Sequence, residues 1–150
     1  MTHKHKEELN NLMENVLSDE RFDRLNDFMA HGRTSIYDHS MRVARLSFLI
    51  NERLRLKSDK KSLVKGALLH DYYLYDWHVP QPGTKKLHGF SHAEDAMKKA
   101  HEHFGLTKKE ANIVYSHMWP LNITHLPKSK EAWIVCLADK ICSLQETIKR

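Results

Sequence analysis

An apolar run that ends in His70 and Asp71 constrains this chain more than any other feature of its sequence. Leu63, Ala67 and Leu74 recur at helical spacing around His70, which places the imidazole on the buried side of a helix. A buried imidazole beside a carboxylate is costly unless a partner compensates both groups. A hydrogen-bonded His–Asp pair at a helix end is one solution. A divalent cation is another, because it binds neutral imidazole and carboxylate together.

Apolar residues three and four positions apart predict helices along nearly the whole chain. The expected helices cover residues 7–17, 19–30, 36–54, 59–71, 92–104, 108–118 and 130–148. Capping boxes mark three of the starts, and they pair Ser35 with Asp38, Ser91 with Glu94 and Thr107 with Glu110. In the last helix, Asp139 lies in line with Val135 and Cys142, beside an apolar stripe formed by Trp133, Leu137, Ile141, Leu144 and Ile148.

The segment from Tyr72 to Phe90 contains two prolines and two glycines and is predicted to be a long loop, with any strand pairing limited to a hairpin inside it. The sequence therefore predicts an all-α protein, a single domain over residues 1–150 with six to seven helices. Its N-terminal helices lie in residues 1–32, and its motif-bearing core covers about 35–145.

Composition limits the classes of protein to consider. No apolar run approaches the roughly 20 residues of a membrane span, and the polar first ten residues do not form a signal peptide. Cys136 and Cys142 are too far apart on one helix for a disulfide, so a reduced, cytoplasmic setting is expected. The formal charge of +5 favours anionic ligands without selecting among nucleotides, nucleic acid and phosphorylated metabolites.

Histidine is the compositional outlier, with 12 residues, and it is the commonest metal ligand. A single histidine on a core-facing stripe is usually a hydrogen-bonded structural residue. Several ligating groups that converge are different, because their burial without a cation would be costly. The candidate ligands are His39, His70, Asp71, His92, His117 and Asp139.

The order and context of these residues resemble a known family. His39 in Tyr-Asp-His-Ser-Met-Arg-Val, the pair His70-Asp71 after an apolar run, and Asp139 in Leu-Ala-Asp-Lys are similar to the motifs of the HD-domain metal-dependent phosphohydrolase superfamily. His92 in Gly-Phe-Ser-His-Ala and His117 in Tyr-Ser-His-Met-Trp resemble the additional ligands of its six-ligand, two-metal members. The chain reads Tyr72-Tyr73-Leu74 where the cyclic-di-GMP branch of the superfamily has a Gly-Tyr-Pro signature.

The resemblance implies a specific site. One metal ion would be held by His39, His70, Asp71 and Asp139, and a second by His92, His117 and a bridging Asp71. A hydroxide between the two ions would attack a phosphoester or phosphoanhydride bond of a nucleotide-like substrate. Imidazole-rich ligation favours iron, manganese, zinc, nickel or cobalt. Lys140 follows Asp139 and is a candidate catalytic residue that neutralises a phosphate. Lys85, Lys86 and His88 are further candidates for substrate contact.

Two alternatives remain open at this stage. In the first, the protein is a one-metal HD nucleotidase in which His92 and His117 are structural. In the second, it is a non-catalytic HD domain that binds a nucleotide or nucleic acid. Nucleic acid is not favoured, because the lysines and arginines are scattered through the sequence. The expected partner is a phosphorylated small molecule or nucleotide, no membrane association is expected, and the oligomeric state is open.

Overall fold

The structure is a computed structural model, and it describes residues 1–72 and 88–149, except for the side chains of residues 88–92. The elements are, in chain order, α1 (His3–Leu17), α2 (Glu20–Asp23), the 3₁₀ helix η1 (Arg24–Asp27), β1 (Met29–His31), β2 (Thr34–Ser35), α3 (Ile36–Arg53), α4 (Lys60–Leu69), α5 (His88–Phe104), α6 (Lys108–Ser116) and α7 (Lys130–Ile148).

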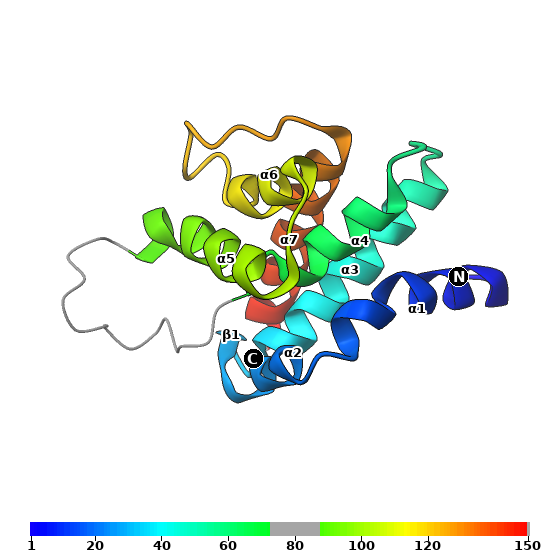
Figure 1. Ribbon diagram of the computed structural model, residues 1–150, viewed down its shortest axis with the longest axis horizontal. Helices are drawn as coiled ribbons and strands as arrows, with labels where there is room; N and C mark the ends of the chain where they lie inside the picture. Colours follow the sequence, from blue (N-terminus) through cyan, green and yellow to red (C-terminus); the bar gives the residue numbers. More distant parts are fainter. Residues whose placement is uncertain (73–87, 150) are drawn as a thin grey trace.

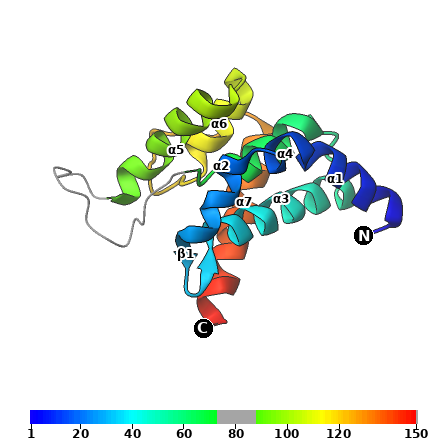
Figure 2. The same cartoon turned by 60° about the horizontal axis from the view of Figure 1, so that its bottom comes forward.

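Helices α3, α4 and α7 pack against one another at the centre of the molecule (Figure 1). Helix α1 lies against α4, and α6 packs on both α4 and α7, with α5 against α6. Figure 2 shows the C-terminal end of α7 beside the short β1–β2 hairpin. The core residues at these contacts are aliphatic and aromatic side chains such as Val43, Phe48, Leu68, Ile113 and Val135. This arrangement confirms the predicted all-α class.

The helix starts are fixed by side chains that accept hydrogen bonds from unpaired backbone N–H groups. Ser35 Oγ accepts from the backbone N–H of Asp38 at 3.1 Å, and Asp59 accepts from that of Ser62. Thr107 and Glu110 form the predicted capping box at the start of α6. The two cysteines, Cys136 and Cys142, are free and buried, as predicted. Among the described helices, none is long and apolar enough to cross a membrane.

The prediction of a second helix over residues 19–30 is wrong beyond the first turns. The chain forms α2 and η1 and then turns into the antiparallel hairpin, in which Met29 pairs with Ser35. Gly32 has a φ of 58°, which a glycine adopts without steric cost, so it turns the chain back here and does not end a helix. The prediction that any hairpin would lie within 72–90 is therefore also wrong. Residues 73–87 of that predicted loop lie outside the described residues, and α5 begins at His88, before the predicted start at His92.

The apolar stripe predicted for the last helix does not pack into the core. Trp133 is 45% exposed, Leu137 52%, Leu144 62% and Ile148 73%. The buried side of α7 contains Val135, Asp139 and Cys142, the three residues that the sequence analysis placed in line, together with several small side chains. Packing of α7 against α3 and α4 therefore buries the side that carries Asp139 rather than the side with the larger apolar residues.

Candidate metal centre

Four of the predicted ligands meet where α3, α4 and α7 converge. His39 lies in the first turn of α3, His70 is the residue that ends α4, and Asp71 follows it. Asp139 lies in the middle of α7. All four are buried, with exposed fractions between 0% and 7%.

The ligating atoms of these four residues all lie within 4.8 Å of one another. His39 Nε2 is 2.9 Å from Asp139 Oδ1 and 3.4 Å from Asp71 Oδ2. His70 Nε2 is 3.2 Å from His39 Nε2, 3.3 Å from Asp71 Oδ2 and 3.4 Å from Asp139 Oδ1. Two nitrogens and two oxygens thus surround one point.

This donor set fits a divalent cation. A metal ion bound at about 2.1 Å to each donor places neighbouring donors about 3.0–3.4 Å apart, whether the geometry is octahedral or tetrahedral. The contacts between the four residues fall at or close to that range. Two imidazoles and two carboxylates are also a ligand chemistry that divalent transition metals prefer.

The second nitrogen of each histidine ring is held by a hydrogen-bond acceptor. His70 Nδ1 donates to the carbonyl of Ala67 at 2.6 Å, and His39 Nδ1 donates to Glu146 Oε2 at 2.8 Å. His117, which ends α6, donates from Nδ1 to the carbonyl of Val114 at 2.6 Å. We assign these donors from the acceptors that they face. Because Nδ1 carries the proton in each ring, the Nε2 lone pair of the neutral imidazole is available for a metal ion.

Asp71 presents its two carboxylate oxygens to different histidines. Oδ2 faces His39 and His70, whereas Oδ1 lies 3.2 Å from His117 Nε2. His117 is 1% exposed, and its ring lies 4.9 Å from that of His70, centroid to centroid. A fifth predicted ligand therefore lies against the four-residue cluster, next to the second carboxylate oxygen of Asp71.

The electrostatics of the cluster favour positive charge. Burial opposes charge on the imidazole, but hydrogen bonds to Asp139 and Glu146 raise the pKa of His39 to about 9. Burial acts likewise on His70, and there the charges of Asp71 and Asp139 raise the pKa well above its ordinary value. Burial alone would raise the pKa of Asp139, yet His39 and His70 hold it well below its ordinary value. Burial lowers the pKa of His117, against the opposing effect of Asp71. The buried carboxylates thus favour the protonated, positively charged forms of His39 and His70.

Several predicted site residues lie outside the four-residue cluster or outside the described part of the chain. The backbone of His92 belongs to α5, but its side chain lies outside the described residues, as does that of His88. Lys85 and Lys86 also lie outside them. Lys140 is exposed, and its Nζ donates to the carbonyl of His117 at 3.2 Å and to Cys136 Sγ at 3.1 Å. Lys140 therefore lies beside the end of α6 that carries His117.

Among the described residues, three that the sequence analysis did not single out contact the cluster. Glu146 binds His39, while Ser143 Oγ donates to Asp139 Oδ1 at 3.2 Å. His31 Nε2 lies 3.1 Å from Ser143 Oγ, and His31 comes from the hairpin that sequence analysis did not predict. Glu146 had a usable signal, since it follows Asp139 by seven residues and so shares its helix face.

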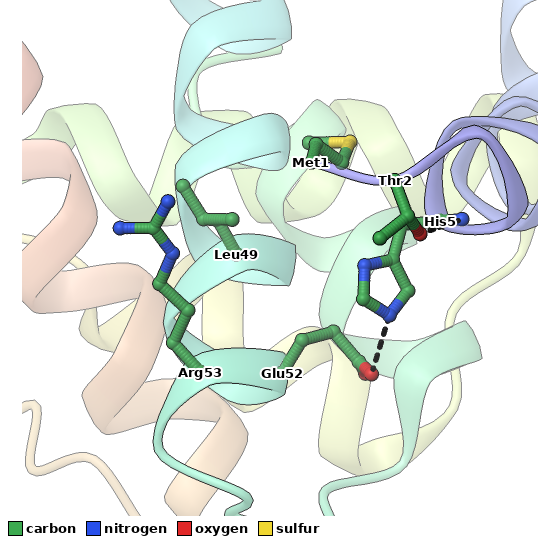
Figure 3. A pocket seen from close by; sticks show the side chains of 6 residues that line it. All are labelled: Met1, Thr2, His5, Leu49, Glu52 and Arg53. Carbon is green, nitrogen blue, oxygen red and sulfur yellow. Dashed lines mark hydrogen bonds and ion pairs between the residues drawn. The ribbon is translucent and has the colours of Figure 1, made fainter.

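A cavity that is separate from this cluster lies elsewhere in the structure. Its volume is about 370 Å³, and it lies between the start of α1 and the end of α3 (Figure 3). The lining residues are Met1, Thr2, His5, Leu49, Glu52 and Arg53. Figure 3 shows His5 directed toward Glu52, with 3.6 Å between Nε2 and Oε2. None of the candidate ligands whose side chains the structure describes lines this cavity.

The helical fold and the buried cluster of two histidines and two aspartates make this chain a candidate divalent-metal-binding protein. Comparison with protein families identifies the HD domain over residues 36–144, so this chain belongs to the HD-domain family. HD domains bind divalent metals and are generally metal-dependent phosphohydrolases. Comparisons with curated proteins and with solved structures gave no match.

Proposed function

We propose that this protein is a phosphohydrolase that cleaves a phosphoester or phosphoanhydride bond of a nucleotide-like substrate with two divalent transition-metal ions. One ion would bind His39, His70, Asp71 and Asp139. The other would bind His117, His92 and the second oxygen of Asp71.

The observation that carries the proposal is the position of Asp71 between His117 and the two histidines of the four-residue cluster. Its Oδ2 lies 3.3 Å from His70 Nε2, and its Oδ1 lies 3.2 Å from His117 Nε2. A carboxylate with one oxygen toward each side suits a group that bridges two cations, and its negative charge offsets the repulsion between them. The four-residue cluster already suffices for one ion, so His117 is best explained by a second.

The residues of the chain have distinct roles in this proposal. His39 and His70 supply neutral imidazole Nε2 atoms, each fixed by the acceptor at Nδ1. When bound, the ions would supply Lewis acidity toward the phosphate and would activate water for attack on phosphorus. Lys140, exposed beside His117, is in a position to neutralise charge on an incoming phosphate. A phosphorylated small molecule or nucleotide is the proposed partner, and the chemistry of the ligands favours iron, manganese, zinc, nickel or cobalt.

Metal content and hydrolysis, measured together, test the proposal. Protein purified without chelator and loaded with excess Mn²⁺ should bind two ions per chain. It should then hydrolyse members of a panel of phosphomonoesters, phosphodiesters and nucleoside polyphosphates. His117→Ala should lose one ion and most of the activity but keep the other ion, because the four-residue cluster remains intact.

Asp71→Asn separates this proposal from its alternatives. The substitution keeps the size of the side chain but removes the charge that faces His39 and His70 on one side and His117 on the other. We expect it to lose more metal than His117→Ala and to abolish hydrolysis, while Asp38→Asn, an exposed position on α3, changes neither. A wild type that binds a single ion and is fully active would support the one-metal nucleotidase. A protein that binds metal and nucleotide but hydrolyses no member of the panel would support a non-catalytic domain.

A further inference from the structure

Glu146 is a buried carboxylate that lies behind the candidate metal centre. It lies on α7, two turns after Asp139, and its side chain is 0% exposed. Its Oε2 accepts a hydrogen bond from His39 Nδ1 at 2.8 Å. Its Oε1 lies 3.4 Å from an Arg42 guanidinium nitrogen, so the carboxylate is held from both ends.

The geometry excludes Glu146 as a ligand of the same ion as His39. His39 Nε2 faces Asp139, Asp71 and His70, so it is the nitrogen directed at the cation site. The other nitrogen, Nδ1, faces Glu146. A neutral imidazole has one lone pair, and if Nε2 uses it for the ion, Nδ1 carries a proton and donates it to the carboxylate.

His31, His39 and Glu146 also have ligating atoms within 4.8 Å of one another, which raises the question of another cation. If His39 bound one cation through each of its two nitrogens, its ring would have to lose both N–H protons. His31 Nε2 already contacts Ser143, which in turn holds Asp139. This second group therefore supports the ligands of the first and does not form a site of its own.

We propose that Glu146 is a positioning residue of the metal centre, which fixes the tautomer and orientation of His39 and strengthens its binding of the cation. This inference rests on the proposed function, since it needs the cluster to bind metal. The negative carboxylate makes the imidazole a better electron donor through the Nδ1 hydrogen bond. Ala67 and Val114 offer only neutral carbonyls to His70 and His117, so the charged partner distinguishes His39 from the other two histidines.

The test compares Glu146 with another buried glutamate of the same helix. Glu131 and Glu146 are each 3% exposed when the whole residue is counted. Glu131, however, accepts from the backbone N–H of Asp59 at 2.8 Å and lies near Lys109. Glu146→Gln and Glu131→Gln each remove one buried charge from α7 and keep the size of the side chain. We expect the Kd for Mn²⁺, measured by competition with a chelator, to rise by about 10–100-fold in Glu146→Gln. The Kd of Glu131→Gln should stay within about twofold of the wild type, whatever its thermal stability.

The outcomes separate this inference from the proposed function. If the wild type binds no Mn²⁺, the proposed function fails. If the wild type binds Mn²⁺ and Glu146→Gln binds it equally well, Glu146 is a structural residue and the inference is wrong. Equal losses of affinity in both variants would also overturn it. If Glu146→Gln does not fold, Glu146→Asp provides the test, because its shorter side chain keeps the charge but withdraws it from His39. Wild-type affinity in Glu146→Asp would contradict the inference.

Discussion

His39 shows how a single residue couples protonation to metal binding. Its imidazole is fully buried between Asp139 and Glu146, and its pKa is raised from 6.5 to about 9. A raised pKa in the folded state means that the folded protein binds a proton more tightly than the unfolded chain does. The metal-free protein therefore gains stability from this proton below pH 6.5 and loses that stability as the pH rises through about 9. The shift corresponds to a contribution on the order of 3 kcal/mol.

We predict opposite pH dependences for stability and for metal affinity. The melting temperature of the metal-free protein should fall between about pH 6.5 and pH 9, because the unfolded chain releases the His39 proton in this range while the folded protein still holds it. The affinity for Mn²⁺ should rise over the same range, since the cation and the proton compete for His39. His39→Gln, which does not titrate, should weaken both dependences. A melting temperature of the metal-free protein that is flat or rising over this range would contradict the assignment.

At the scale of the elements, the contact between α4 and α6 sets the separation of His70 and His117. Gly66 on α4 faces Ile113 on α6, and a Cβ at position 66 would lie 2.6 Å from Ile113 Cγ2 and 2.9 Å from its Cβ. No real contact is this short, so the two helices would have to separate. His70 follows Gly66 by one turn on α4, and His117 follows Ile113 by one turn on α6. The glycine therefore allows the approach that brings both histidines to Asp71.

We predict that Gly66→Ala destabilises the protein. Alanine in a helix interior is usually more stable than glycine by about 0.5–1 kcal/mol, but overpacking of a core costs about 1–3 kcal/mol. The net loss should be about 1–2 kcal/mol in denaturant unfolding. Ile113→Ala should cost less in the Gly66→Ala background than in the wild type, because the cavity then accommodates the new methyl group. A Gly66→Ala protein as stable as the wild type would show that the helices do not meet so closely.

The elements differ in how far the sequence determines them. Local chemistry was sufficient at Ser35 and at Thr107, where a side chain caps the backbone of its own helix, and these starts were predicted correctly. Local chemistry was insufficient at Gly32, because a glycine can either end a helix or turn a hairpin. The pairing of Met29 with Ser35 decided the outcome. For α7 the stripe with Trp133 was the more apolar side, yet contacts with α3 and α4 selected the opposite one.

At the scale of the whole molecule, the site is built from residues far apart in the sequence. His39, His70, Asp71 and Asp139 converge in the structure, and that they bind a metal ion there stays a prediction. His31 was not predictable, because its approach to Ser143 depends on a hairpin of three and two residues that only tertiary packing specifies. The number of ions, the substrate, the role of Lys140 and the cytoplasmic location stay predictions.

The last prediction follows from the way the site joins three helices. One ion would cross-link α3, α4 and α7, and it would compensate the buried charges of Asp71 and Asp139, which are 5% and 7% exposed. A ligand that binds only the folded state at 100 times its Kd stabilises that state by about 2.7 kcal/mol. For a chain of this size, saturating Mn²⁺ at pH 8 should raise the melting temperature by about 5–10 °C over chelator-treated protein.

His70→Ala should remove most of this shift, because it deletes a ligand from α4. Asp38→Asn, on the exposed side of α3, should keep it. If loaded and chelator-treated wild type melt at the same temperature, the cation does not bind at the junction of these helices.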